Sequence, residues 1–465
     1  MTARDVLRTL LAVAVIAGSA FLLAPSVASL GGPKHHGPLT DPIDFIAFYC
    51  GGKVLAAGAD PYRYEPLHTC EARALAESQL TILRYVAVPA PLPPYALAFF
   101  SAFSFVPFRA AAACFLLVSL GCIGAAIVQC RRLTTLSLPV VGALLALALI
   151  VGSIFIGQLV PLVAASLCAS AVALRAGRFG ASAGFALFTL LEPHVGLAVL
   201  LGLFVLAPRT RVPLGIGAGA LALLSLAAGG PALNVEYLTR VIPAHAAAEA
   251  GNFHAQYSLT AALRELGVGS DAALRLGEAS YAVMLAVGLV LAGRLRAAFG
   301  DDAFAVVTPP ACVLVGGVFV HDHQMALALP FAFVLARYVA RRPALVVALF
   351  CLAVPWQSVY ETSLGSVFPA HARFDPSPAL ARAAVPSALA ERVWEVWVRT
   401  LDYRDGRTPW EILLFKLPTW LAFAFFGVAA VRALRESRAH PARAGLRLAG
   451  QPSAPPPDLR SATRR

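Results

Sequence analysis

Charged residues are scarce in this sequence. Of its 465 residues, 13% are charged and 59% are hydrophobic, and the mean hydropathy is +0.74. Soluble domains carry roughly 25% charged residues, so the composition excludes an ordinary soluble globular protein. Apolar runs of about 20 residues, each long enough to cross ~30 Å of hydrocarbon, recur along the chain. The composition therefore predicts an all-α protein: a polytopic transmembrane helical bundle.

Nucleotide-binding motifs are also missing. The sequence has no Walker loop, no Rossmann glycine fingerprint and no clear Asp-x-Asp. These absences argue against a nucleotide-sugar or ATP site, and we expect no cofactor. The net charge of +12 comes in large part from arginines that flank apolar runs, as in cytoplasmic loops. It therefore does not indicate a nucleic-acid partner.

Hydropathy predicts about twelve membrane spans, give or take one or two. They cover residues 6–30, 88–108, 110–130, 136–156, 158–174, 182–206, 212–228, 275–296, 303–320, 324–340, 343–360 and 410–432. The first run is long for a secretory signal peptide, and further spans follow it, so we expect it to remain as an uncleaved helix. The sequence thus predicts a multi-pass protein of the plasma membrane, with residues 1–432 forming one membrane-embedded domain.

Charge bias orients these spans. Arginines at 294–296, at 341–342 and in the tail 433–465 indicate the cytoplasmic side. Alternation then places the three long polar segments outside, at residues 31–85, 229–274 and 361–409. The tail is rich in arginine and proline and is predicted to be disordered.

Two basic sites disagree with this orientation. Arg131–Arg132 and the "RAGR" stretch at 175–178 fall on the outside when the predicted spans are counted in order. The disagreement suggests that one segment between 88 and 174 is a half-helix or a re-entrant segment.

The first outer segment contains "DFIAFYCGGKVLAAGADPY", starting at Asp44. Positions 44, 48, 51 and 55 share one helical face, and "EPLHTCEARALAESQL" predicts a second helix. We expect both to be amphipathic and to lie along the outer membrane face. Asp44 can accept a proton from a substrate hydroxyl, or it can cap the helix and favour its dipole. Asp60, in "GADPY", is typical of a turn.

Two of the eight cysteines stand apart. Six lie in or beside predicted spans, where cysteine packs as a small apolar residue. Cys50 and Cys70 both lie in the first outer segment, on either side of the "GADPY" reversal. An antiparallel helical hairpin brings such residues together, and disulfides persist outside the cytoplasm. We predict a Cys50–Cys70 disulfide; the alternative is two unpaired small residues packed under the hairpin.

Four stretches resemble the polyprenyl-phosphate-mannose-dependent, mannosyltransferase-like glycosyltransferases of family 87, which are C-type integral membrane enzymes. These stretches are "DFIAFYCGGKVLAAGADPY", "PLPPYALAFFSAFSFVPF", "GQLVPLVAASL" and "GFALFTLLEPHVGLAVLL", and they follow the family's order over about the first 200 residues. The resemblance implies a C-type glycosyltransferase fold and inverting transfer from a lipid-phosphate sugar. It also implies that the acid in the first outer loop, Asp44 here, is the general base.

One position departs from that family's pattern. Lys-Pro is common where this chain has Glu192–Pro193, and a glutamate cannot hold a phosphate as a lysine can. Glu192 and His194 still lie deep in a predicted span, where ionisable residues usually face a cavity or a partner. They either line the donor site or form a structural pair beside a proline kink. Gln158, in "GQLVP", is expected to line the same site.

The stretch "FVHDHQMALALP" carries His321 and His323 at the outer end of a predicted span. A metal site is one interpretation, but two histidines and one aspartate on one loop are a weak signal, and we expect no metal. Stabilising the charge of a departing phosphate is a second, and a polar helix cap is a third. The resemblance places an outer-face histidine near the acid. Five basic residues of the outer segments are further phosphate candidates: Lys53, Arg63, Arg84, Arg240 and Arg373, of which Lys53 and Arg84 are preferred.

These patterns predict one function and leave a second open. The first is transfer of a hexosyl group, mannosyl by the resemblance, from a polyprenyl-phosphate sugar to a lipid or glycan acceptor at the outer face. The second is a transporter or flippase for a lipid or sugar, which predicts inverted repeats and broken helices at mid-membrane. A scaffold without catalysis is a third class. Convergence of Asp44, His321 and His323 on one outer site would favour the enzyme.

Overall fold

A computed structural model describes residues 42–74, 87–251, 253, 256–339, 343–356, 393–394 and 409–439. Within these ranges the regular structure is helical, and an isolated antiparallel bridge pairs Gln256 with His321. The all-α prediction is therefore confirmed for the described part of the chain.

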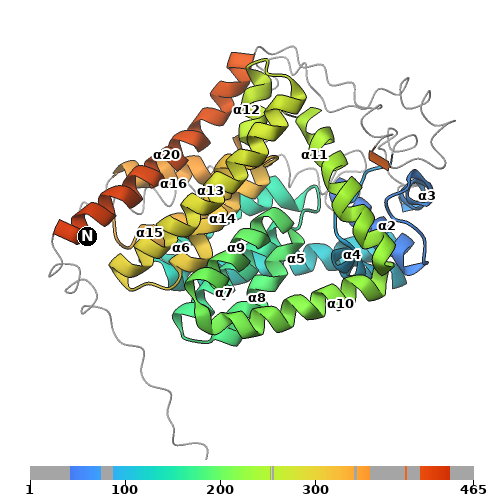
Figure 1. Cartoon of the computed structure of the whole chain (residues 1–465), viewed down its shortest axis with the longest axis horizontal. Helices are drawn as coiled ribbons and strands as arrows, with labels where there is room; N and C mark the ends of the chain where they lie inside the picture. Colours follow the sequence, from blue (N-terminus) through green and yellow to red (C-terminus); the bar gives the residue numbers. More distant parts are fainter. Residues whose placement is uncertain are drawn as a thin grey trace, which may run out of the picture.

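The helices follow one another in the order shown in Figure 1. The α-helices are α2 (Ile43–Ala56), α3 (Tyr64–Ala74), α4 (Pro94–Ser101), α5 (Phe108–Leu133), α6 (Leu138–Leu149), α7 (Val160–Arg175), α8 (Phe179–Phe188), α9 (Pro193–Leu206), α10 (Arg211–Glu236), α11 (Ile242–Gly251), α12 (Leu259–Glu265), α13 (Ser270–Phe299), α14 (Phe304–Gly316), α15 (Leu329–Leu335), α16 (Pro343–Ala353) and α20 (Pro409–Ala439). Short 3₁₀ or π turns are η3 (Ala102–Phe105), η4 (Ile150–Ile154), η5 (Thr189–Leu191), η6 (Pro208–Thr210), η7 (Tyr237–Val241) and η9 (Asp322–Ala328).

Four described helical segments are long and apolar enough to cross a membrane. They are Phe108–Leu133, Pro208–Gly251, Ser270–Phe299 and Leu413–Ala439. Large apolar side chains on these helices are exposed, among them Leu117, Ile216 and Val283. Soluble monomers rarely expose contiguous apolar patches of large area, whereas a lipid-facing helix does so along its length. Length, composition and exposure together are those of a membrane protein.

The arginine-rich connections gather at one end of the helical body. The Arg175 side chain donates to the backbone carbonyl of Arg132 at 3.0 Å and forms two bonds of 2.9 and 2.5 Å with the Asp301 carboxylate. The Arg296 side chain donates to the carbonyl of Leu206 at the same end. The ends of α5, α7, α9 and α13 therefore lie together. Counted in order, the predicted spans put Arg131–Arg132 and 175–178 opposite the 294–296 arginines, and these contacts contradict that placement.

Two predicted spans account for that error. Residues 88–108 contain only the short α4 and η3, so they do not form one long helix. Residues 182–206 are two helices, α8 and α9, separated at Glu192. The Arg209 guanidinium, just after α9, lies 5.4 Å from the ring of Phe179 at the start of α8. The segment therefore folds back on itself as a hairpin, with its tip at Glu192 and both ends at the arginine-rich end.

Helix α2 differs from the predicted surface helix. Its side chains are buried over almost the whole circumference, from Phe45 to Gly52. The Phe45 ring stacks on Phe115 with ring centroids 4.5 Å apart, and Tyr49 donates to the carbonyl of Val106 at 3.0 Å. Helix α3, in contrast, buries positions 64, 67 and 71 and exposes others, as an amphipathic helix does.

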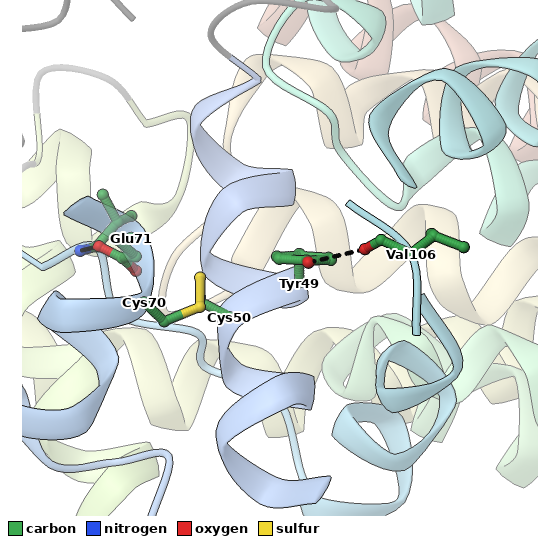
Figure 2. Close-up of a disulfide and its surroundings, with 6 residues drawn as sticks. Tyr49, Cys50, Cys70, Glu71 and Val106 are labelled. Atoms are coloured by element: carbon green, nitrogen blue, oxygen red, sulfur yellow. Dashed lines mark hydrogen bonds between the residues drawn. A yellow bond between two sulfur atoms is a disulfide. The ribbon is translucent and has the colours of Figure 1, made fainter. Parts of the chain in front are cut away.

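A disulfide joins Cys50 of α2 to Cys70 of α3, with the Cα atoms 5.7 Å apart. This separation lies within the roughly 7 Å limit for such a bond. Figure 2 shows the bond on one side of α2 and the Tyr49 hydrogen bond on another. The carboxyl of the neighbouring Glu71 is buried and accepts the backbone N–H of Val88 at 2.8 Å, while burial raises its pKa well above the usual range. The disulfide thus connects α3 to α2, and the Glu71 hydrogen bond connects α3 to the segment that precedes α4.

Several sequence predictions fall outside the described residues. They include the span 6–30, residues 75–86 of the first polar segment and nearly all of 361–409. At the other end, α20 continues to Ala439, a few residues past the predicted start of the tail at 433.

Candidate functional site

Asp44 lies in the first turn of α2, where neighbouring segments hold its backbone and its carboxylate. Its N–H donates to the carbonyl of Ile156 at 2.8 Å, and the Gln158 side-chain amide donates to its Oδ2 at 2.6 Å. Pro42 occupies the N-cap position, and it makes no side-chain cap. Asp44 is therefore not the N-cap residue of α2. The hydrogen bond from Gln158 fixes the direction of its carboxylate.

Gly157 makes this approach possible. Its backbone has φ of +75°, which L side chains rarely adopt, and a Cβ atom there would lie 2.6 Å from the Cβ of Phe45. The turn 153–157 can thus press against the start of α2, which brings the next residue, Gln158, to Asp44. Pro161 then occupies the first turn of α7, where a missing N–H costs no helical bond. The "GQLVP" stretch is explained by these local requirements.

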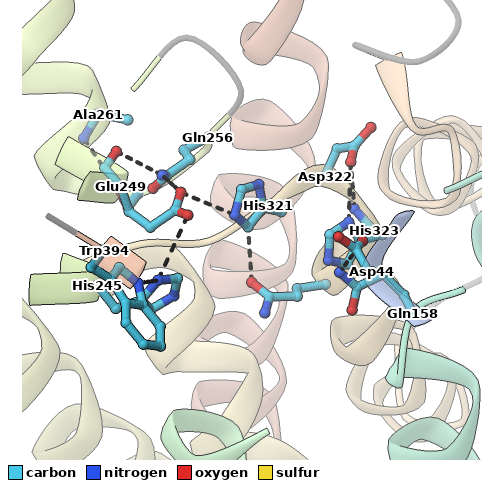
Figure 3. A network of polar contacts seen from close by, with 12 residues as sticks. Asp44, Gln158, His245, Glu249, Gln256, Ala261, His321, Asp322, His323 and Trp394 are labelled. Atoms are coloured by element: carbon cyan, nitrogen blue, oxygen red, sulfur yellow. Dashed lines mark hydrogen bonds and ion pairs between the residues drawn. The ribbon is translucent and has the colours of Figure 1, made fainter. Parts of the chain in front are cut away.

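His321 is the N-cap residue of η9, and His323 lies in the first turn of that helix. Their rings stack with centroids 5.3 Å apart and an interplanar angle of 7°. The Nε2 atom of His321 is 3.2 Å from a carboxylate oxygen of Glu249 on α11. His323 is buried and is close enough to Asp44 for its charge to act on that carboxyl (Figure 3). The two histidines thus connect α11 to the start of α2.

The tip of the α8–α9 hairpin reaches the same histidine segment. The Gln324 side-chain amide donates to the Glu192 carboxylate at 2.9 Å, while the Gln324 carbonyl oxygen accepts the His321 backbone N–H at 3.0 Å. The Nδ1 atom of His194 lies 3.9 Å from Glu192, and its Nε2 is buried with no hydrogen-bond partner among the described residues. The hairpin can fold tightly at Gly196 because glycine has no Cβ atom. A Cβ at this position would lie 2.6 Å from the carbonyl oxygen of Thr189.

We call these residues together the polar cluster. Its members are Asp44, Gln158, Glu192, His194, His245, Glu249, Gln256, His321, Asp322, His323 and Gln324. Within the described residues, no group of three or more His, Cys, Asp or Glu is arranged to hold a metal ion.

The surroundings change the acidity of two members. Burial, the largest effect, raises the pKa of the Asp44 carboxyl above its ordinary value, although His323 and the Gln158 hydrogen bond oppose it. Burial, the largest single effect, would lower the pKa of His321, but the surrounding carboxylates, Glu249 first among them, together outweigh it, and the net result is a pKa of about 9. At neutral pH the site thus pairs a carboxylate of increased basicity with an imidazolium.

An apolar pocket adjoins Asp44. Its volume is about 10 Å³, room for roughly one water molecule, and its lining comes from the start of α2, from α5 and from the 154–157 turn. The lining residues are Pro42, Phe45, Ala112, Phe115, Leu116, Ser119, Ile154 and Gly157. Pro42 and Phe45 flank Asp44 in the chain, and Gly157 precedes Gln158. The pocket therefore lies beside the backbone segments that carry Asp44 and Gln158, and neither of these side chains is part of its lining.

The structure brings six of the eight predicted site residues together: Asp44, Gln158, Glu192, His194, His321 and His323. Lys53 is not among them, because it lies exposed in the last turn of α2, with its ammonium 5.6 Å from the centroid of the Tyr49 ring. Arg84 lies outside the described residues.

Sequence reasoning missed His245, Glu249 and Gln256. A signal for the first two was present, because positions i and i+4 of a helix share one face, and both fall on α11. Gln256 donates to the Glu249 carboxylate at 2.5 Å, and nothing in its local sequence marks it. Trp394, whose Nε1 lies 3.4 Å from Nδ1 of His245, is equally unmarked.

The chemistry available here is specific. A carboxylate of raised basicity can remove a proton from a hydroxyl, and the neighbouring imidazolium can stabilise an anion. The arrangement therefore suits a substrate that offers a hydroxyl and carries an anionic group. No protein-family model, curated protein or solved structure matches this chain, so its function is argued from the site itself.

Proposed function

We propose that this protein is a membrane glycosyltransferase. It transfers a hexosyl group, mannosyl by the resemblance, from a polyprenyl-phosphate sugar to a lipid or glycan acceptor. The observation that carries the proposal is the position of Asp44. Its carboxylate is oriented by Gln158, has a raised pKa, and lies close to the two histidines.

Asp44 acts as the general base of an inverting transfer. The acceptor hydroxyl attacks the anomeric carbon while the carboxylate takes its proton. The new bond joins the acceptor oxygen to that carbon, and the bond between the carbon and the phosphate oxygen breaks. Gln158 engages Oδ2, so the hydroxyl approaches the other carboxylate oxygen, Oδ1. A buried carboxylate with raised pKa is a stronger base than a solvated one.

Polyprenyl phosphate leaves with increased negative charge on its phosphate. Among the residues that the structure describes, the polar cluster holds no lysine or arginine, so its histidines are the source of positive charge there. His321, with a pKa of about 9, is cationic at neutral pH, and it stacks on His323, which lies near Asp44. Such charge stabilisation in a site shielded from water is usually the largest contribution of an enzyme to rate.

The proposal places the protein in the plasma membrane with the polar cluster at the outer face and a C-type glycosyltransferase fold. The arginines gathered at the opposite end support this orientation, because cytoplasmic ends carry an excess of arginine. Setting aside 88–108 and 182–206 leaves about ten of the predicted spans, and both Arg131–Arg132 and 175–178 then fall on the cytoplasmic side. The remaining spans agree with the charge bias.

A transporter or flippase is the second candidate, and one observation favours it. Helices α8 and α9 form a hairpin interrupted at Glu192 inside an apolar segment, and transporters place substrates at broken helices. A transporter would move a lipid-linked sugar without breaking its phosphate bond.

One pair of assays separates the two functions. The purified protein is reconstituted into liposomes that contain a radiolabelled polyprenyl-phosphate hexose, with lipid and glycan acceptors added. The proposal predicts labelled glycosylated acceptor together with free polyprenyl phosphate. Movement of the intact donor between leaflets, with no product from any hexose or acceptor tested, would instead support the transporter.

A further inference from the structure

Glu249 is bound more rigidly than its place near the end of α11 requires. The Gln256 side-chain amide donates both to the Glu249 backbone carbonyl at 2.8 Å and to its carboxylate at 2.5 Å. Gln256 is itself fixed, because it forms an antiparallel bridge with His321, and the N–H of Tyr257 donates to the carbonyl of Val320 at 2.7 Å. The segment that carries Gln256 thus aligns Glu249 with the His321 segment.

The His321 ring is held from two sides as a result. On one side its Nε2 meets the Glu249 carboxylate at 3.2 Å, and on another its face stacks on His323. Figure 3 shows Glu249 and Asp44 on opposite sides of the two histidines. Glu249 therefore lies behind His321 as viewed from Asp44. Its position is explained by its contact with His321, without direct contact with a substrate.

Several charged groups face His321, and they do not act alike. Those that act electrostatically with it are Asp44, Glu192, His194, His245, Glu249 and Asp322, and His323 stacks on it. Glu249 opposes the effect of burial most strongly, ahead of Asp322 and Asp44. Of the carboxylates, Glu249 is also the one in direct contact with the ring. Its loss should change the charge of His321 more than the loss of either aspartate.

We propose that Glu249 is a positioning residue that holds His321 in place as a fixed positive charge on the phosphate side of the site. The inference rests on the proposed function, in which polyprenyl phosphate departs and the described residues of the cluster include no lysine or arginine to receive it. The role matches the geometry, because an acid behind the ring fixes both the orientation and the protonation of an imidazole. Glu249 touches neither substrate nor Asp44 in this scheme.

The charge of His321 can be measured without substrate. Diethyl pyrocarbonate modifies neutral imidazole, and peptide mass spectrometry identifies the histidine modified. The His321 side chain is 24% exposed, compared with 14% for His245 and 6% for His323, so it is the most accessible of the three. With a pKa of about 9, roughly one His321 in a hundred is neutral at pH 7, whereas about half or more are neutral near the ordinary pKa of ~6.5.

The expected result is at least a tenfold faster modification of His321 at pH 7 in Glu249→Gln than in the wild type, by that change in the neutral fraction. Glu249→Asp should restore slow modification in part. Glu278→Gln, which removes an exposed carboxylate of α13, should leave the rate at the wild-type value. Equal His321 rates in the wild type and in folded Glu249→Gln and Glu249→Asp would overturn the proposal.

A pH profile of transfer provides the second measurement. The wild-type rate should fall as pH rises through about 9, and in Glu249→Gln the same fall should move toward neutral pH, with Glu249→Asp between the two. An unmoved alkaline limb would contradict the positioning role even if activity were lost. If no hexose or acceptor gives transfer while modification of His321 still depends on Glu249, the glycosyltransferase proposal fails and the assignment of the fixed charge stands.

Discussion

Replacing Cys50 and Cys70 together by alanine should destabilise the protein by about 3 kcal/mol, by the loop-entropy model of a disulfide. The two residues are 20 positions apart in the chain. Closing a loop of that size removes about 11 cal/mol/K of entropy from the unfolded chain, which is about 3 kcal/mol at 25 °C. Cys50 is fully buried in α2, so loss of its sulfur also leaves less packing around that helix.

Equilibrium unfolding of the purified, non-reduced protein in detergent measures this difference. The matched control is Cys114→Ala, because Cys114 is a free, exposed cysteine on α5. It should unfold within about 0.5 kcal/mol of the wild type, as surface substitutions usually do. Adding reductant should lower the stability of the wild type and leave the double variant unchanged. A double variant as stable as the control, or free thiols at both positions in a non-reduced peptide map, would refute the reasoning.

Further outcomes can be measured on the same preparation. Gly157→Ala should destabilise by about 1–3 kcal/mol because it strains a positive-φ position and brings a Cβ against Phe45, whereas Gly180→Ala, with open space around it, should not. The transfer rate should fall as pH falls through the pKa of Asp44, and burial places this acid limb above the ordinary ~3.9. The stabilisation from His321 should be complete below ~6.5, the unfolded pKa, and be lost in unfolding curves as pH rises through about 9. Activity should survive EDTA; loss that a divalent ion restores would contradict this.

Hydropathy located most of the helices but not all of their directions. Apolar length is what makes α5, α13 and α20 recognisable, and these are among the segments long enough to cross a membrane. Apolar length gave the wrong result at 88–108 and 182–206, because hydropathy does not show where a helix ends. Pro93–Pro94 and Glu192–Pro193 were the local signals, since a residue before proline is driven out of the helical region. How these breaks change the order of the spans became clear only from the contacts of Arg175 with Arg132 and Asp301.

The error over α2 has a different cause. Assigning it to the membrane surface relied on four positions that share one helical face. The run from Phe45 to Cys50 is apolar on nearly every side, and a helix of that kind is usually buried. What it is buried against, the phenylalanines around α4 and α5, lies far along the chain. Burial also explains why the Asp44 carboxyl has a raised pKa, which an exposed surface helix would not produce.

The candidate site was foreseeable in part. Asp44 and the histidine pair are conspicuous because polar residues interrupt an apolar sequence. Glu249 is less so, since its partner His321 is 72 positions away and only the fold brings the two together. The hydrogen bond between Gln158 and Asp44 spans 114 positions and is equally invisible to local pattern.

The central claim is that Asp44 is the base of a glycosyl transfer, and one comparison tests it most directly. Transfer from a polyprenyl-phosphate hexose is measured for the wild type, Asp44→Asn and Asp60→Asn, each shown to be folded. Asp60 is a matched control because it forms a turn with Arg63, 3.1 Å away, and lies outside the polar cluster. The account predicts a fall in turnover of about 10²-fold or more for Asp44→Asn, the usual contribution of a general base, and a much smaller change for Asp60→Asn. Full turnover in folded Asp44→Asn would contradict it.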